Sequence, residues 1–240
     1  MSIPADHVET PAIVRALARG DELVPVWRND YGGLTFRAGA RYIKWCPRNL
    51  ETSLADEAVR LRWAVRYTPV PRVIEFGGDA DAEWLVTDAL RGESAVAPRW
   101  VADPATAVRA IGEGLRALHD ALPVESCPYV WDVPSRLANA AARGIHVPAR
   151  FADPPPVDEH VVCHADACSP NTLIGEDGRW SAHVDLGLLG VGDRWADIAV
   201  AAMSTEWNYG PGWEDELVAA YGAAPDRERL AFYRDLWNAT

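Results

Sequence analysis

Three side chains that could handle protons and metal ions lie close together in the sequence, between residues 163 and 187. Asp166 offers a carboxylate that could orient a hydroxyl group and accept its proton. Asn171 and Asp185 offer hard oxygen atoms, and Mg²⁺ prefers such ligands and is usually held by one or two carboxylates together with phosphates. These residue types indicate phosphoryl transfer, with Asp166 as the catalytic base and Asn171 and Asp185 as metal ligands.

The order of these residues matches a kinase catalytic loop followed by a magnesium loop. His164 precedes Asp166 by two residues, and Asn171 follows Asp166 by five. Asp185 begins an Asp-x-Gly sequence that ends at Gly187, as in kinases. The alternative is coincidence, with Asp166 capping a turn, Asn171 in a loop and Asp185 ending a strand. A chance match is expected in roughly one chain in a thousand if each required residue type takes a few per cent of positions.

The flanking residues predict the structure that such a loop needs. Val161-Val162-Cys163 is a short apolar run, typical of a strand, directly before the loop. Two further strand-like runs, 172–174 and 180–184, flank Gly175-Glu176-Asp177-Gly178, which favours a hairpin turn. A strand, a loop and a hairpin leading to the Asp-x-Gly sequence are therefore predicted, and this context argues against coincidence.

A second candidate site lies in the first quarter of the chain. Alternation in the run 41–45 places Lys44 on one face of a predicted strand, from which kinases reach the α- and β-phosphates of ATP. Ser53 can cap a helix whose apolar stripe is Leu54, Ala58, Leu61 and Val65, and Glu57 lies on that same side. A carboxylate there is costly unless a cation pairs with it. We therefore predict a Lys44–Glu57 ion pair, the alternative being that Lys44 is an ordinary surface residue.

These segments resemble the aminoglycoside phosphotransferase family, which are bacterial antibiotic-resistance kinases with the protein-kinase fold. The family's loop reads His-Gly-Asp-x-x-x-x-Asn, and here Ala165 replaces the usual Gly. The family's Gly-x-x-Asp-Arg/Lys-x-x-Asp-Ile-Ala run is matched by residues 190–199, and its C-terminal helix by residues 224–234. The motifs are closest to those of aminoglycoside 3'-phosphotransferases and streptomycin 3''-phosphotransferases.

The resemblance implies transfer of the γ-phosphoryl group of ATP to a hydroxyl of an aminoglycoside, a cationic small molecule, with Mg²⁺ as cofactor and GTP not excluded. It also implies that backbone groups of Asp88, Ala89 and Leu90, in the linker between two lobes, bind the adenine. Three alternatives stay open: a kinase for another hydroxylated small molecule, a nucleotide-binding pseudokinase without turnover, and a purely structural α+β domain. A protein kinase is disfavoured because no Ala-Pro-Glu sequence follows Asp185.

The predicted fold is α+β and protein-kinase-like, with two lobes. The small N-terminal lobe, residues 1–87, is expected to hold a five-stranded antiparallel sheet and one helix, and residues 88–92 form the hinge. The larger, mainly helical C-terminal lobe spans residues 93–240. The five strands are expected at 23–27, 34–37, 41–45, 70–76 and 83–87.

Two helices are predicted in the C-terminal lobe before the catalytic loop. Asp103-Pro104 has the residues of a helix start, and apolar residues then recur at helical spacing as far as Leu122. His119, near the end of that helix, is expected to interact with the helix dipole rather than to act as a catalyst. A second helix is expected at 134–143. The resemblance implies that Asp197 braces the catalytic loop.

Candidate residues for binding a cationic acceptor are the acids near the expected acceptor site. Those before the loop are Asp158 and Glu159, and the later ones are Glu206, Glu214, Asp215 and Asp235. Asp158 and Glu159 could equally be solvated loop charges. Leu188 replaces an Arg that is frequent in the family just after the Asp-x-Gly sequence, and Met203-Ser204 replaces an Arg-Asp pair that many 3'-phosphotransferases aim at the substrate. These departures leave the identity of the acceptor open.

The composition indicates a globular enzyme and limits its partners. The chain has 240 residues, 49% of them hydrophobic, which can build a large core. The net charge of -12 argues against nucleic acid and anionic membranes as partners, and weakly favours cationic ligands. The sequence shows neither a signal peptide nor a membrane span, so a cytoplasmic location is expected. The four cysteines have no metal-ligand spacing and are expected to be reduced packing residues.

Overall fold

The computed structural model describes residues 8–51 and 53–240, which fall into two compact units. The smaller unit holds the residues up to 66 together with 70–90, and the larger unit holds residues 67–69 together with 91–240. No helix of the described residues combines the length and the hydrophobicity that crossing a bilayer requires. All four cysteines are free thiols, as predicted.

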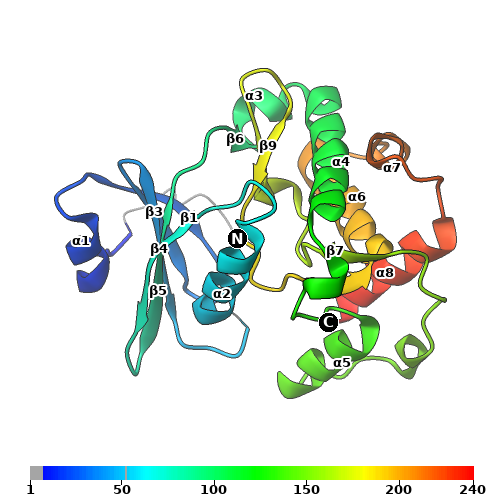
Figure 1. The fold of residues 1–240 in the computed structure, drawn as a ribbon, viewed down its shortest axis with the longest axis horizontal. Coiled ribbons are helices and arrows are strands. Elements are labelled where there is room, and N and C mark those ends of the chain that lie inside the picture. The colour runs from blue at the N-terminus through cyan, green and yellow to red at the C-terminus, as the bar shows by residue number, and fades with distance from the viewer. Residues whose placement is uncertain (1–7, 52) are drawn as a thin grey trace. The chain divides into compact units, whose positions relative to one another are not determined.

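The smaller unit is built on an antiparallel sheet of five strands in the order β1-β2-β3-β5-β4. The strands are β1 (Leu23–Arg28), β2 (Leu34–Ala38), β3 (Arg41–Pro47), β4 (Val73–Gly78) and β5 (Ala82–Asp88). The predicted five-stranded sheet is therefore confirmed. Figure 1 shows helix α2 (Leu54–Ala64) lying beside the strands of this sheet, where it packs on β4 and β5.

The smaller unit contains a second helix that we did not predict, α1 (Ala12–Ala18). Its Val14 and Leu17 pack into one core cluster with Phe36 of β2 and Ile43 of β3. With only seven residues, α1 is too short to show a helical period clearly. The predicted stripe of α2 is also one residue too long, because Val65 is the C-cap and is 38% exposed.

The larger unit is mainly helical. Its helices are α3 (Pro98–Val101), α4 (Pro104–Ala121), α5 (Val133–Ala142), α6 (Arg194–Tyr209), α7 (Glu214–Tyr221) and α8 (Arg227–Ala239), with short 3₁₀ turns η1 (Val124–Ser126), η2 (Ala149–Ala152) and η3 (Ser169–Asn171). The two helices predicted before the catalytic loop are α4 and α5. Helix α4 begins as expected, since the Asp103 carboxylate accepts a hydrogen bond from the Thr106 N–H at 3.4 Å.

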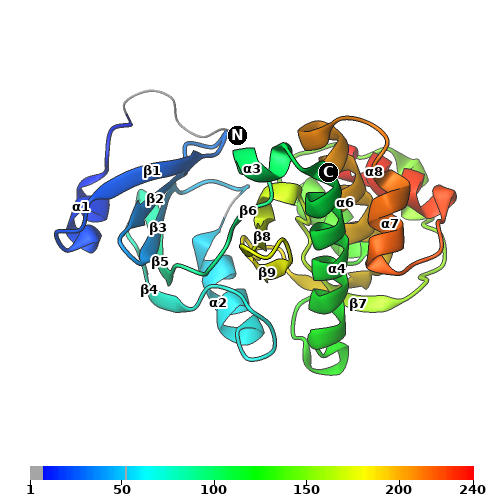
Figure 2. The same cartoon turned by 90° about the horizontal axis from the view of Figure 1, so that it is seen from above.

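Two small antiparallel sheets hold the loops of the larger unit. Strand β7 (His160–Cys163) pairs with β10 (Gly190–Asp193), and β8 (Thr172–Ile174) pairs with both β6 (Glu93–Ser94) and β9 (Trp180–His183). Helix α6 packs against α4, α7 and α8, and these four helices gather together in Figure 2. The loop after β7 and the loop after β9 are thus fixed at both ends by strands or by η3.

Candidate active site

The loop between β7 and η3 carries Asp166, and Asn171 at the end of η3 holds it in place. The Asn171 side-chain Nδ2 donates to the Asp166 backbone oxygen at 2.9 Å and to the Asp166 carboxylate Oδ2 at 3.0 Å. Asn171 is only 8% exposed. The predicted base and one predicted metal ligand are therefore joined directly, and the orientation of the Asp166 carboxylate is set by Asn171.

The surroundings of Asp166 make it a better proton acceptor than an ordinary aspartate. Burial raises the pKa of Asp166, and the nearby Asp185 carboxylate adds to the rise, whereas hydrogen bonds from Cys168 and Asn171 and the nearby His164 side chain oppose it. A raised carboxyl pKa lies closer to neutral pH, which favours general base catalysis. The side chain is partly accessible, so an acceptor hydroxyl could reach it.

His164 connects the Asp166 loop with the segment before Asp185. The His164 Nε2–H donates to the Val184 carbonyl oxygen at 2.9 Å, and its Nδ1 accepts a hydrogen bond from the Asp166 N–H at 3.3 Å. The Val184 N–H in turn donates to the Asn171 carbonyl oxygen at 3.0 Å. The structure therefore links Asp166, Asn171 and Val184, the residue directly before Asp185, by hydrogen bonds within the larger unit.

Two residues of these loops have the left-handed backbone that usually favours glycine: Ala165 with φ 71° and Asp185 with φ 64°. Glycine, which the family resemblance implies at the position of Ala165, would adopt this backbone without strain. A residue other than glycine with this backbone conformation destabilises the folded state by about 1–2 kcal/mol. The strain persists because the surrounding hydrogen bonds hold the loop in this conformation.

We predict that Ala165→Gly raises the free energy of unfolding by about 1 kcal/mol, because glycine adopts a positive φ without strain but also gains freedom in the unfolded chain. Thermal unfolding should show a rise in Tm of about 2–4 °C. The matched control is Ala167→Gly. Ala167 is 6% exposed and has no positive φ, so that change should lower the Tm. A lower Tm for Ala165→Gly would show that Ala165 is not strained.

Asp197 of α6 braces the backbone of the catalytic loop. Its carboxylate accepts hydrogen bonds from the His164 N–H at 2.5 Å, from the Ala165 N–H at 2.9 Å and from His119 Nε2 at 3.0 Å. Burial acts to raise the pKa of Asp197, but the hydrogen bonds from the His119 side chain and from the His164 N–H outweigh it and leave that pKa lowered. Asp197 is therefore an ionised carboxylate that holds the loop at its strained residue.

His119 lies in the last turn of α4, as expected, and also makes contacts that the sequence did not indicate. Its ring is 5% exposed and contacts Asp197 of α6 and the Tyr221 hydroxyl of α7, at 2.8 Å from Nδ1. The ring therefore joins three helices by side-chain hydrogen bonds. Sequence reasoning missed the contact because 78 residues separate His119 from Asp197.

Ser204, one of the residues that depart from the family pattern, packs inside the larger unit. It is fully buried, and its Oγ accepts a hydrogen bond from the Ser169 N–H at 2.8 Å. The Asn208 side chain donates to the same oxygen at 3.2 Å. Ser204 therefore anchors η3 to α6, and it cannot contact an acceptor at the surface.

The Lys44–Glu57 ion pair is present in the smaller unit, as predicted. Lys44 Nζ lies 2.7 Å from Glu57 Oε1, and the Glu57 side chain is 7% exposed. The pair joins β3 to the buried face of α2. It positions the ammonium group of Lys44 on the sheet, which is the arrangement that kinases use to hold phosphates.

We predict that Glu57→Gln lowers the free energy of unfolding of the smaller unit by about 1–3 kcal/mol, since a buried hydrogen bond to a charged group contributes about that much. The free energy of unfolding is measured by urea denaturation, with tryptophan fluorescence as the signal. Asp56→Asn is the control, because Asp56 is 61% exposed in its pair with Arg60, and it should change the free energy by less than about 1 kcal/mol. Equal effects of the two changes would contradict a structural role for Glu57.

The three linker residues predicted to bind adenine belong to the smaller unit. They differ in the hydrogen bonds that their backbone N–H groups donate. The Asp88 N–H donates to the Arg72 carbonyl oxygen at 3.1 Å, and the Ala89 N–H donates to the Ala40 carbonyl oxygen at 2.9 Å. Among the described residues none accepts a hydrogen bond from the Leu90 N–H. Leu90 is therefore the residue of the three whose amide is available to a ligand.

Five of the six predicted acceptor-binding acids already have cationic partners within the chain. Arg194 lies 2.6 Å from both the Asp158 and the Glu159 carboxylates, and Asp235 pairs with Arg150 at 3.1 Å. Further along the chain, Glu214 and Asp215 pair with Arg227. These arginines reduce the negative charge that an ammonium group would meet. Within the described part of the chain, no side chain donates to the Glu206 carboxylate, which is partly exposed on α6.

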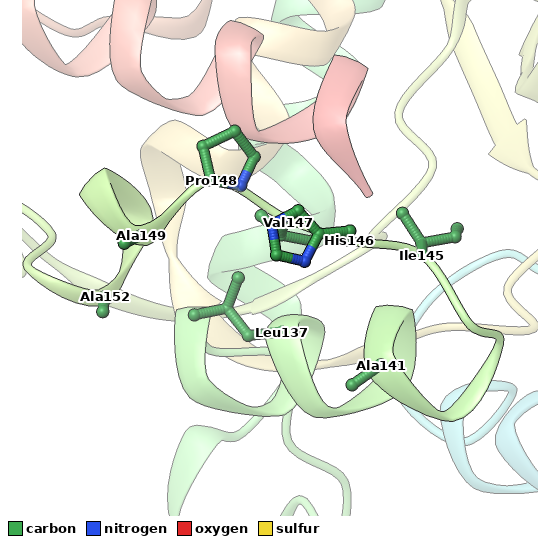
Figure 3. A pocket seen from close by; sticks show the side chains of 8 residues that line it. All are labelled: Leu137, Ala141, Ile145, His146, Val147, Pro148, Ala149 and Ala152. Atoms are coloured by element: carbon green, nitrogen blue, oxygen red, sulfur yellow. The ribbon is translucent and has the colours of Figure 1, made fainter.

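A cavity of about 270 Å³ lies between α5 and the segment that follows it (Figure 3). It is lined by Leu137, Ala141, Ile145, His146, Val147, Pro148, Ala149 and Ala152. The lining is apolar apart from one imidazole and contains no carboxylate. This cavity therefore does not suit a polycationic ligand.

Comparisons with known proteins agree with this geometry. Residues 35–233 match the phosphotransferase enzyme family. An aminoglycoside 3'-phosphotransferase of Streptomyces fradiae is 39% identical over 80% of this chain and 83% of that protein. The streptomycin 3''-kinase of Streptomyces griseus is 33% identical over 97% of each chain.

Solved structures show the same fold. The type VIII aminoglycoside-3'-phosphotransferase is similar with a TM-score of 0.75 and 30% identity, covering 95% of this chain and 97% of that one. An aminoglycoside phosphotransferase of Streptomyces rimosus, solved with ADP and streptomycin, has a TM-score of 0.71 and 27% identity, covering 93% and 95%. The predicted kinase-like α+β fold is thereby confirmed. The chain is a member of the phosphotransferase enzyme family, and within it belongs with the aminoglycoside phosphotransferases.

Proposed function

We propose that this chain is an ATP-dependent phosphotransferase that moves the γ-phosphoryl group to a hydroxyl of an aminoglycoside. The observation that carries the proposal is the loop of the larger unit, in which Asn171 orients the Asp166 carboxylate by two hydrogen bonds. The related 3'-phosphotransferases and streptomycin 3''-kinase support an aminoglycoside as the acceptor. The enzyme would act in the cytoplasm, where ATP is available, and would protect its host from the antibiotic.

Asp166 is the catalytic base of this proposal. Its carboxylate orients the acceptor hydroxyl and takes the proton as the hydroxyl oxygen attacks the γ-phosphorus. The new bond joins the acceptor oxygen to that phosphorus, the bond to the β,γ-bridging oxygen breaks, and ADP leaves. The raised pKa of Asp166, caused mainly by burial, suits a group that must accept a proton during the reaction.

Asn171 and Asp185 fit the binding of Mg²⁺. The Nδ2 of Asn171 is used on Asp166, so its Oδ1 is the side-chain atom left for a cation. Two oxygen ligands from the protein suffice, because Mg²⁺ takes the others from phosphates and water. When bound, the ion neutralises the charge of the phosphates. The described residues contain no group of three or more acidic, His or Cys side chains placed for a metal, in keeping with such a sparse site.

In the smaller unit, we assign the nucleotide phosphates to Lys44. Glu57 keeps the Lys44 ammonium in place at 2.7 Å, so Lys44 can contact phosphates without losing side-chain freedom at that moment. The Leu90 amide is the adenine donor in this proposal, while Asp88 and Ala89 position the linker through their own backbone bonds. This assignment implies an N-terminal lobe of residues 1–87, a hinge of residues 88–92 and a C-terminal lobe of residues 93–240.

For the acceptor we favour Glu206 over the other candidate acids. Its carboxylate is partly exposed on α6, and no arginine of the described residues pairs with it. Asp158, Glu159 and Asp235 would contribute only if an ammonium group displaced their arginines. Ammonium groups meeting carboxylates imply that the Michaelis constant rises with ionic strength, because salt screens charges over about 8–10 Å.

The test is ATP consumption measured with kanamycin, neomycin, streptomycin and neutral sugars, at low and at high salt. We expect turnover with at least one aminoglycoside and a Michaelis constant that rises with salt. Turnover of neutral alcohols with no response to any aminoglycoside would instead favour a kinase for another small molecule. ATP binding without any turnover would indicate a pseudokinase.

A further inference from the structure

Three buried side chains from α4, α6 and α7 lie in series behind the catalytic loop. The Tyr221 hydroxyl is 2.8 Å from His119 Nδ1, and His119 Nε2 is 3.0 Å from Asp197 Oδ2. Tyr221 is 2% exposed, His119 5% and Asp197 0%. The carboxylate at the end of the series holds the backbone N–H groups of the loop that carries Asp166.

The partners of His119 determine which of its nitrogens carries the proton. Asp197 is ionised, since its pKa is lowered, and a carboxylate can only accept, so His119 Nε2 must donate. In a neutral imidazole the Nδ1 is then an acceptor, which requires the Tyr221 O–H to donate. Burial raises the pKa of Tyr221, which keeps its proton in place. Among the described residues, His119 is the partner assigned to that hydroxyl, so donation to Nδ1 satisfies all three side chains.

The packing of α7 against α4 is built for this contact. A Cβ added at Gly112 of α4 would lie 2.8 Å from the Leu217 carbonyl oxygen and 2.9 Å from the Tyr221 nitrogen. Only glycine allows such a close approach of the two helices. The rings of Tyr221 and His119 also meet edge to face, with centroids 5.5 Å apart. The position of the Tyr221 hydroxyl therefore depends on backbone packing and not on a flexible side chain.

We propose that Tyr221 is a positioning residue for phosphoryl transfer: its hydroxyl holds His119 in the tautomer that donates to Asp197, and Asp197 then fixes the Asp166 loop. The proposal rests on the proposed function for its effect on turnover. Its effect on His119 does not depend on any substrate. Without the Tyr221 hydroxyl, the buried Nδ1 of His119 has no hydrogen-bond donor. The tautomer with its proton on Nε2 is then less favourable, and the hydrogen bond from Nε2 to Asp197 is weakened.

The test is Tyr221→Phe, measured by steady-state kinetics and by ¹⁵N NMR of the histidine side chains. We expect kcat to fall about fivefold to tenfold, which corresponds to the loss of one buried hydrogen bond. The Michaelis constants for ATP and the aminoglycoside should change by less than about twofold, since Tyr221 is only 2% exposed. The His119 Nδ1 resonance should lose the position of a hydrogen-bonded acceptor. The control is Tyr233→Phe, which removes a buried phenol of α8 (3% exposed) that does not contact His119.

A fall in kcat with unchanged His119 resonances would overturn the proposal, because the hydroxyl would then act only on stability. Changed resonances with unchanged kcat would overturn it as well. Should Tyr221→Phe fail to fold, the wild-type spectrum decides: it must show the proton of His119 on Nε2, and a proton on Nδ1 contradicts the tautomer. A wild type without turnover would contradict the proposed function, while the NMR result alone would still show whether Tyr221 sets the state of His119.

Discussion

Asp166→Asn lowers turnover by a factor on the order of 10² or more, as expected for the loss of a positioned base. The amide has the shape of the carboxylate, so the contact from Asn171 at 3.0 Å can be kept after a flip of the amide. Burial raises the pKa of Asp166, which means that the site disfavours a charge there. A neutral isostere should therefore fold at least as stably as the wild type.

The assays for this variant separate chemistry from binding. Turnover is measured with saturating ATP and aminoglycoside. Nucleotide binding is measured by thermal shift, where a ligand at a hundredfold its Kd stabilises the folded state by about 2.7 kcal/mol. The control is Asp177→Asn, in the exposed turn of the hairpin between β8 and β9. An Asp166→Asn enzyme with turnover near that of the wild type would remove Asp166 from the mechanism.

Asp197→Asn has the second large effect, on both stability and turnover. The asparagine side chain has one oxygen in place of two, so it cannot accept from His164, Ala165 and His119 together. The free energy of unfolding should fall by about 3–5 kcal/mol, because buried donors are left without acceptors. Turnover falls as well, since the loop that carries Asp166 loses its brace.

The pH dependence of stability tests whether the negative charge of Asp197 causes the difference in stability between the wild type and Asp197→Asn. Its pKa is lowered in the folded state from an ordinary value of 3.8. The stabilisation is therefore complete above about pH 5 and is lost as the pH falls through 3.8 toward the lowered folded pKa. Urea titrations at several pH values should show the gap between wild type and Asp197→Asn narrowing on acidification. The control is Asp235→Asn, because the Asp235 side chain is 56% exposed in its pair with Arg150. This change should lower the free energy of unfolding by less than about 1 kcal/mol. A gap that is constant with pH would contradict an ionised Asp197.

The residues nearest the chemistry could be predicted from sequence because their spacing is local. Asn171 is five residues from Asp166, and a short loop between two strands leaves few geometries for them. Glu57 could be found because a charged residue on an apolar helical stripe requires a partner. Its position identified Lys44, which the structure places at 2.7 Å.

The supporting residues could not be predicted because their partners are distant in the chain. His119, Asp197 and Tyr221 come from three helices. Asp197 follows His119 by 78 residues in the sequence, and Tyr221 follows it by 102. No local pattern marks such a contact. The burial of Ser204 could not be predicted, because a resemblance in sequence does not show which face of α6 packs inward. The acids Asp158 and Glu159 were correctly found as charges, but their pairing with Arg194 depends on the folding of β7 against β10.

The most direct measurement of the central claim is mass spectrometry and ³¹P NMR of the product formed from ATP and each aminoglycoside. Wild-type enzyme should yield an antibiotic that has gained one phosphoryl group as a phosphate ester on a hydroxyl, with one ADP formed per ester. Asp166→Asn should yield at least about a hundredfold less in the same time. ATP hydrolysed to free phosphate with every aminoglycoside unmodified, or equal ester formation by the two proteins, would contradict the account.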